Sequence, residues 1–213
     1  MLLTYRYRLL PTRAQHARLA DILESQRQLY NHALAERIDA YERTCLEVER
    51  GLRKKPLSIS YFDQANSLTI LGRDPLTRDE FNKVPKLLQH WTLKRLDDAY
   101  SAFFRRIKAG TEKPGFPRFR GKEFWSSFGA ALVGSAPISF DGRRVRIGAR
   151  TCNLRIRVHM DRPLPNDAVI RSVVFTRAPG GRKWYVSFQC VRRHRSDISG
   201  NTNRQPALPA VIR

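Results

Sequence analysis

The residues in this sequence that could catalyse a reaction are few, and their spacing favours other roles. Most carboxylates between Asp21 and Glu49 lie three or four places from Arg or Lys, which is typical of ion pairs on a helix surface. A metal-dependent nuclease needs several carboxylates around its divalent ions, yet Asp141, Asp161 and Asp167 fall in expected turns. No zinc-binding spacing of His, phosphate-binding loop or nucleophile elbow occurs. The sequence therefore predicts a binding protein without catalytic residues, metal or cofactor.

The three cysteines, Cys45, Cys152 and Cys190, are far apart, and none belongs to a C-x-x-C pair. Their odd number and their spacing argue against a disulfide framework and against a zinc ribbon. We expect three free thiols in a reducing cytoplasm.

The composition favours the binding of a polyanion. The 213 residues include 40 Lys and Arg against 19 Asp and Glu, which gives a formal net charge of +21. A compact protein with this much like charge repels itself, and a protein that neutralises phosphates gains by releasing their counterions. No apolar run reaches the roughly 20 residues of a membrane span, and the first residues lack the apolar core of a signal peptide. We expect a cytoplasmic, nucleoid-associated protein that binds nucleic acid and no membrane.

The first residues predict a strand, and a long helical pattern follows it. Residues 1–10 alternate, with Arg6 and Arg8 on the polar face. Thr12 and Gln15 then have the spacing of a capping box. An apolar stripe at helical spacing continues to about residue 50, interrupted near residue 25, where the pattern allows a break. The stripe consists of Leu19, Ile22, Leu23, Leu29, Tyr30, Ala33, Leu34, Ile38 and Tyr41.

Two further helices are expected before residue 110. Residues 60–72 predict a short helix that turns Phe62, Ala65, Leu68 and Leu71 inward. Pro85 suits a first helical position, and an apolar stripe from Leu88 to Ile107 predicts a long helix that ends at Gly110. Its other faces are expected to carry the basic residues Lys86, Lys94, Arg95, Arg105, Arg106 and Lys108.

The last third of the chain changes from helical to alternating periodicity. Asp141-Gly142 predicts a hairpin turn between two alternating runs, and residues 179–182 predict a second turn. Residues 153–160 alternate cleanly, with Arg155 and Arg157 on the polar face. The outward positions of these strands are largely Arg, and short strands with such turns suggest a small barrel or sandwich.

The order of these elements predicts an α+β fold. A lone N-terminal strand is unstable, so we expect residues 1–10 to join the later strands, which makes the helical recognition region, residues 11–118, an insertion in a small barrel. Residues 119–195 would complete the barrel, and residues 196–213, which lose all periodicity, are expected to form a disordered tail.

The crossing between helices and barrel, residues 108–128, reads KAGTEKPGFPRFRGKEFWSSF. Its aromatic residues, Phe116, Phe119, Phe124 and Trp125, are too apolar for a solvated linker. We expect some of them to plug the junction and some to stack on bases. Lys113, Arg118, Arg120 and Lys122 would then meet phosphates from a rigid frame; a purely structural plug is the competing interpretation.

The order of several motifs resembles the N-terminal half of the TnpB (OrfB) family of insertion-sequence proteins. These motifs are YRYRLLPTRAQHARL, YNHALAERIDAY, LQHWTLKRLDDAYSAFFRRIKAG, KPGFPRFRGKEFWSSF and the terminal KWYVSFQCVRR. The resemblance implies that the strands form an oligonucleotide-binding-like wedge β-barrel, with the helices inserted as a recognition lobe. It also implies guide-type RNA and target-adjacent DNA as partners. A full-length relative would be a further partner.

The resemblance implies particular residues as well. Tyr61 and Lys86 stand where the family contacts the target-adjacent motif, and His90 stands where the family often has Gln. A His side chain cannot form the pair of hydrogen bonds through which a Gln side chain recognises adenine. The complete set of candidate nucleic-acid-binding residues is Arg6, Arg8, Tyr61, Lys86, His90, Arg105, Arg106, Lys108, Lys113, Arg118, Arg120, Lys122, Arg155 and Arg157.

The family's RuvC-like nuclease domain and zinc ribbon are absent from this sequence, so we expect no nuclease activity. The alternative is a DNA-only helix-turn-helix protein that binds transposon ends. Against it, residues 12–50 look like one helical stretch without a Gly turn.

Overall fold

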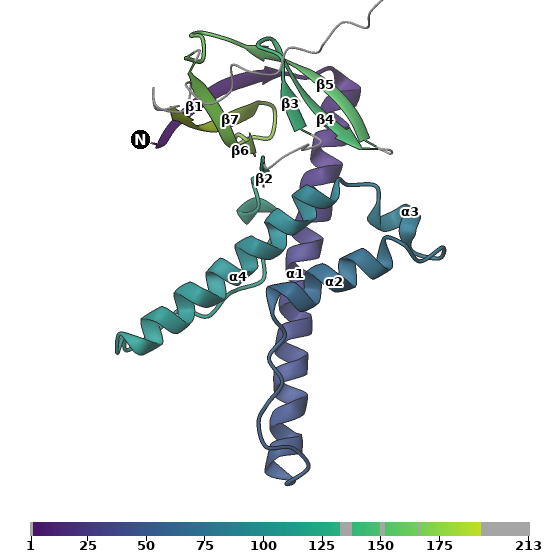
Figure 1. Ribbon diagram of the computed structural model, residues 1–213, viewed down its shortest axis with the longest axis vertical. Coiled ribbons are helices and arrows are strands. Elements are labelled where there is room, and N and C mark those ends of the chain that lie inside the picture. The colour runs from purple at the N-terminus through teal and green to yellow at the C-terminus, as the bar shows by residue number, and fades with distance from the viewer. Residues whose placement is uncertain (1, 133–137, 150–151, 166, 193–213) are drawn as a thin grey trace, which may run out of the picture.

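The computed structural model describes residues 2–132, 138–149, 152–165 and 167–192. A group of helices lies beside an antiparallel sheet that curls into a half-barrel (Figure 1). The α+β class and the insertion of the helices between strands are therefore confirmed. The expected tail lies outside the described residues, and the expected domain boundary between residues 118 and 119 stays a prediction.

The N-terminal strand β1 (Leu2–Leu10) lies in the interior of the sheet, as its isolation in the sequence predicted. It pairs antiparallel with β7 (Trp184–Arg192) on one side and with β5 (Cys152–His159) on the other. The other strands are β2 (Ser127–Ala131), β3 (Ile138–Phe140), β4 (Arg144–Ala149) and β6 (Ala168–Arg177). The order is β2-β6-β7-β1-β5-β4-β3, and within the described residues β2 and β3 do not pair, so the barrel stays half open.

Helix α1 (Arg13–Glu49) is one uninterrupted helix of 37 residues. The predicted capping box of Thr12 and Gln15 is present, and the Gln15 side chain also donates to the Arg155 carbonyl at 2.8 Å, which ties the start of α1 to β5. The break allowed near residue 25 is wrong. Gln26, in the polar interruption, is buried and accepts a 2.6 Å hydrogen bond from Thr92, so a polar side chain continues the inward face of the helix.

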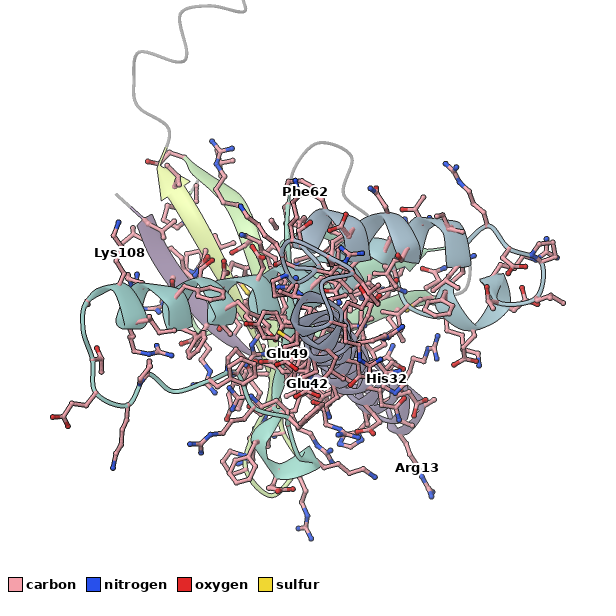
Figure 2. The ribbon with its side chains drawn as sticks, turned by 90° about the horizontal axis from the view of Figure 1, so that it is seen from below. Arg13, His32, Glu42, Glu49, Phe62 and Lys108 are labelled. Atoms are coloured by element: carbon pink, nitrogen blue, oxygen red, sulfur yellow. The ribbon has the colours of Figure 1, made fainter. Side chains whose placement is uncertain are left out.

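Helix α2 (Tyr61–Leu71) begins at a capping box of Ser60 and Asp63, contacts α4, and is bonded to α1 through the Gln64 side chain. Ala65 and Leu68 are buried as expected, but Phe62 is 73% exposed and points outward (Figure 2). Its predicted inward position is wrong because Gln64, which accepts a 2.9 Å hydrogen bond from Arg37, occupies the face toward α1.

Helix α4 (Lys86–Lys108) follows a short helix α3 (Arg78–Phe81) and crosses α1 beneath the sheet (Figure 1). Leu88, Leu93 and Leu96 are buried in its first half. The second half projects away from the sheet, which leaves Ile107, expected in the apolar stripe, 47% exposed.

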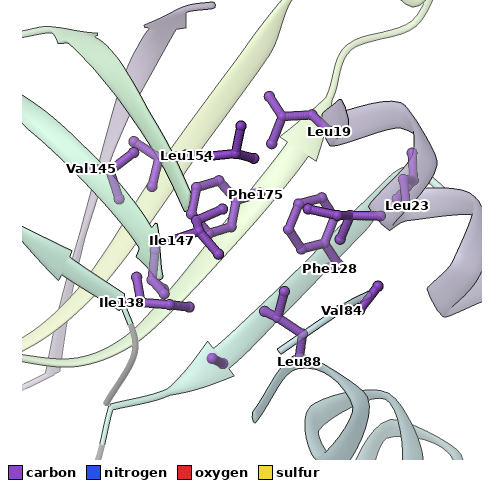
Figure 3. Close-up of a cluster of buried hydrophobic side chains, with 14 of the residues drawn as sticks. Leu19, Leu23, Val84, Leu88, Phe128, Ile138, Val145, Ile147, Leu154 and Phe175 are labelled. Atoms are coloured by element: carbon purple, nitrogen blue, oxygen red, sulfur yellow. The ribbon is translucent and has the colours of Figure 1, made fainter. Parts of the chain in front are cut away.

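One core joins the helices to the inner face of the half-barrel (Figure 3). Phe128 of β2 stacks on Phe175 of β6 with ring centroids 5.1 Å apart. Leu19 of α1 and Leu88 of α4 reach the same cluster from the helices. The inner face of the sheet is thereby covered, so only its outer face is free to meet a partner.

The crossing from α4 to β2, which we call the strap (residues 109–126), includes one 3-10 turn, η1 (Lys122–Phe124), and is held by specific contacts. Asn31 of α1 accepts a hydrogen bond from the Arg120 amide at 2.8 Å and donates to the Arg120 carbonyl at 3.1 Å. Arg27 donates to the same carbonyl at 2.8 Å. The expectation of an ordered crossing is confirmed.

The aromatic residues of the strap divide into two groups. Trp125 is 2% exposed, with its ring centroid 5.1 Å from that of Tyr30, and is the plug of the junction. Phe116 packs edge-on against Tyr100 and Phe103 yet remains 44% exposed. Phe119 and Phe124 are 57% and 69% exposed. The three cysteines are free, as predicted.

Replacing Trp125 by Ala is expected to lower the free energy of unfolding by about 3–5 kcal/mol, because it leaves a cavity where α1, α4 and β2 meet. Urea denaturation measures the change. Phe119→Ala is the matched control and should cost well under half as much, since that ring is mostly in solvent. Equal losses in the two variants would contradict the assignment of Trp125 as the plug.

Candidate nucleic-acid interface

The outer face of β1, β4 and β5 carries rows of arginine. Strand register places Arg144 opposite Arg157 and Arg146 opposite Arg155. Directly opposite residues on a sheet have Cβ atoms about 5 Å apart, and like charges there are destabilising. We call this surface the arginine face; it comprises Arg6, Arg8, Arg144, Arg146, Arg155 and Arg157, all exposed.

The charges of the arginine face are not compensated by the protein. In the part of the chain that the structure describes, none of its six guanidinium groups forms an ion pair, although pairs occur elsewhere on the helices, as at Arg27–Glu24 and Lys94–Asp97. Each long side chain is free to reach an anion, and a row of guanidinium groups matches a chain of phosphates. The free protein therefore holds this face at an electrostatic cost that a polyanion would remove.

A pocket of about 330 Å³ opens at the β1 end of the arginine face. It is lined by Arg6, Arg8, His159, Asp161 and Tyr185. Arg8 lies opposite both His159 on β5 and Tyr185 on β7. The Arg6 guanidinium sits 4.2 Å from the centre of the Tyr185 ring, a cation–π arrangement. The pocket thus combines a planar stacking surface, cations and one carboxylate.

A second candidate site joins α2 and α4. Tyr61 Oη lies 3.3 Å from His90 Nδ1, at hydrogen-bonding distance, and Lys94 Nζ lies 6.0 Å from the centre of the Tyr61 ring. Burial, and to a lesser extent the neighbouring Lys86 cation, lowers the pKa of His90. The structure therefore brings together Tyr61, Lys86 and His90, three residues implied by the resemblance. Their contact with DNA stays a prediction.

The basic end of α4 and the strap form a third region, in which the tip of α4 projects away from the sheet and the strap returns to the sheet at β2. Lys108 lies at the far tip of α4 (Figure 2). Arg105, Lys108, Lys113, Arg118, Arg120 and Lys122 are exposed there. Arg106 donates to the Gly115 carbonyl at 2.6 Å, so it holds the strap. The fourteen predicted residues therefore occupy three separate places.

Sequence reasoning missed three residues of importance. Arg144 and Arg146 complete the arginine face, and the alternation in residues 143–148 was the signal for them. Arg95, expected on a charged outer face, is instead half-buried, with its guanidinium carbon 4.4 Å from the Trp125 ring centre, and it donates to the Ser127 carbonyl at 3.3 Å. Burial is the main cause that lowers the pKa of Arg95, with Arg120 nearby as a lesser cause. This side chain positions the strap.

Two other kinds of site were sought in the described residues. Among them, no group of three His, Cys, Asp or Glu side chains is arranged to hold a metal ion. Nor is any helix of that part of the chain long and apolar enough to cross a membrane.

The fold is of the α+β class, and its outer sheet surface carries the arginine face. Residues 1–45 match the family model of the helix-turn-helix domain of OrfB proteins from IS605-type insertion sequences. The N-terminal part of this chain is therefore an OrfB/TnpB-family region, and the match indicates a DNA-binding protein of the transposase type. No curated protein matches the chain significantly. The matched residues form β1 and the greater part of the single helix α1 rather than two helices and a turn.

The lowered pKa of His90 predicts a pH effect on stability. Between the ordinary His pKa, near 6.5, and the lower pKa of the folded state, the unfolded chain binds a proton that the folded protein does not. Stability should therefore fall as the pH drops through this window. His90→Gln, a neutral residue that can still bond Tyr61, should lose less stability between about pH 7.5 and pH 5.5 than the wild type.

Urea midpoints at the two pH values measure this difference. His32→Gln, which replaces an exposed histidine of α1, is the matched control and should follow the wild type (Figure 2). If His90→Gln shows the full pH dependence of the wild type, the burial of a neutral His90 is refuted.

Proposed function

We propose that these 213 residues bind nucleic acid without cleaving it, holding a guide-type RNA on the arginine face and a target-adjacent DNA motif on the helices. The observation that carries the proposal is the direct opposition of Arg144 to Arg157 and of Arg146 to Arg155. Placing like charges opposite each other on a sheet weakens folding. Such an arrangement is understandable where phosphates neutralise it.

The shape of the surface supports RNA or another single strand as the ligand of the arginine face. A sheet presents its side chains over a broad surface, and Arg6 with Tyr185 adds a stacking platform at its edge. Phosphate contacts combined with such stacking are the usual means of binding single strands and RNA. The uninterrupted α1 lacks the turn between two helices with which a helix-turn-helix docks in a major groove. This geometry favours the RNA proposal over the DNA-only alternative.

The site between α2 and α4 suits the DNA part of the proposal. Tyr61 and His90 are partly exposed polar groups held by one hydrogen bond, and Lys86 is an exposed cation beside them. A single hydrogen bond from His90 to a base edge and a phosphate contact from Lys86 would read a short motif. The exposed basic residues of the strap lie in a separate place and would contact the phosphate backbone elsewhere along the bound nucleic acid. A full-length relative would compete for the same nucleic acids.

The arginine face predicts a strong salt dependence of binding. The variant in which Arg144, Arg146, Arg155 and Arg157 are all replaced by Gln should bind RNA more weakly, and the slope of log K against log salt should become shallower by about 2–3. In the absence of RNA, the same variant should be more stable at low salt, by about 0.2–1 kcal/mol for each like-charge pair removed.

Fluorescence anisotropy across a salt series measures the first effect, and thermal unfolding at low salt measures the second. The matched control replaces Arg43, Arg50, Lys54 and Lys55 by Gln; it removes the same charge from the exposed far end of α1 and the loop after it. The control should keep most of the wild-type slope. If both variants lose the same slope, net charge and not the arginine face governs binding, and the proposal fails.

The exposed arginines of the strap are expected to contribute to nucleic-acid affinity but not to the stability of the fold. Arg118→Ala combined with Arg120→Ala should weaken nucleic-acid binding several-fold while leaving the unfolding midpoint near that of the wild type. The reason is that both side chains are exposed, and Arg120 is anchored through its backbone. Unchanged affinity in this double variant would leave the strap with a structural role alone.

Three ligands distinguish the alternatives in one set of titrations. Guide-type RNA, a single-stranded DNA of the same length and a transposon-end duplex are each titrated, and Mg²⁺ is then added to look for cleavage. Retention of the duplex alone would replace the RNA proposal with the DNA-only alternative. Cleavage of any of these ligands after Mg²⁺ is added would refute the proposal that the protein binds nucleic acid without cleaving it.

A further inference from the structure

The pocket beside Tyr185 differs from the rest of the arginine face in having a carboxylate. Asp161 lies just after β5 and is exposed. Although Arg6 and Arg8 line the same pocket, Asp161 forms no ion pair with either in the described structure. A negative charge here opposes the binding of phosphate, so Asp161 is better suited to binding another part of a nucleotide. A carboxylate accepts hydrogen bonds, and bases offer donors at their edges.

The neighbouring side chains provide the remaining features of a site for one base. Tyr185 is half-buried on β7, the Arg6 guanidinium lies 4.2 Å from the centre of its ring, and both side chains line the pocket. Bases stack on aromatic rings and on guanidinium planes. Arg8 and His159, paired across β1 and β5, line the pocket and can meet the phosphate of the same nucleotide. The volume of about 330 Å³ is near the lower limit for small-molecule pockets.

We propose that this pocket holds an unpaired cytosine of a bound strand, with the base stacked on Arg6 and its exocyclic amino group donating to Asp161. The proposal rests on the nucleic-acid-binding function proposed above and assigns a base preference to one place on that surface. Cytosine and uracil have the same size and differ at position 4, where cytosine has an amino donor and uracil a carbonyl acceptor. A carboxylate that faces position 4 therefore accepts a hydrogen bond from the cytosine amino group and repels the uracil carbonyl.

Three adjacent strands fix the stacking and basic residues of the pocket, and Asp161 follows two residues after the end of β5. Tyr185, Arg6 with Arg8, and His159 come from β7, β1 and β5, whose order in the sheet is fixed by continuous pairing. These strands lie at the middle of the half-barrel, where the opposite face is packed on the core (Figures 1 and 3). The surface on which a base would stack is therefore set by strand pairing.

The test compares short oligocytidine with oligouridine, each as RNA and as DNA, by fluorescence anisotropy at neutral pH and about 0.1 M salt. The wild type should bind oligocytidine about tenfold more tightly, the size expected for one hydrogen bond to a charged group. Asp161→Asn, whose amide serves either pyrimidine, should bring the two affinities within about twofold without weakening the binding of oligouridine. A preference seen in only one sugar type would identify the strand that occupies the pocket.

Glu42→Gln is the matched control, because it removes one negative charge from an exposed position on the far half of α1 (Figure 2). It should keep the full preference for cytosine. Both variants alter exposed side chains, and an unchanged unfolding midpoint confirms that each is folded. Equal binding of the two oligonucleotides by the wild type would refute the proposed cytosine site, as would a preference that survives in Asp161→Asn. Either result would leave the proposed binding of nucleic acid by the arginine face unaffected. Failure to bind any oligonucleotide overturns the proposed function itself.

Discussion

The pairing of β1 between β7 and β5 is the constraint on which the rest of this structure depends. The first strand of the chain lies in the interior of a sheet whose other strands come after the helices, so the helical region must leave the sheet and return to it. Gln15 binds the β5 backbone where the chain leaves, and Trp125 fills the junction where it returns. The strap, the crossing of α1 and α4, and the covered inner face all follow from this route.

The same pairing decides where charge accumulates. Because side chains alternate across a strand, each arginine of β1, β4 and β5 that leaves the core is placed on one outer surface. Arg8 gains His159 as its neighbour, and Arg155 gains Arg146. On the helices, by contrast, Lys94 forms an ion pair with Asp97 and Arg27 forms one with Glu24. Several helix charges are thus paired with an opposite charge, whereas the guanidinium groups of the arginine face have no such partner among the described residues.

Much of the fold could be predicted because its local signals are strong. The alternation of β5, the Asp141-Gly142 turn and the capping box at Thr12 each depend on neighbouring residues alone. Errors occurred where a partner far along the chain mattered. The helix continues through residue 25 because Gln26 finds Thr92 on α4, and Arg95 turns inward because Trp125 lies over it. The same holds for the candidate site. The individual arginines could be identified from the sequence, but their grouping into three places could not, because it depends on contacts between distant segments.

The sequence by itself determined the class of fold, the excess of positive charge and which face of each strand would be apolar, since composition and periodicity are local properties of the chain. Tertiary structure alone decided that Arg144 would lie opposite Arg157, that Arg106 would bind the strap, and that Asp161 would join Arg6 and Tyr185 in one pocket. The reason is physical: strand register and helix crossing are set by packing between distant segments. A side chain acquires a neighbour, and with it a chemical role, only when those segments meet.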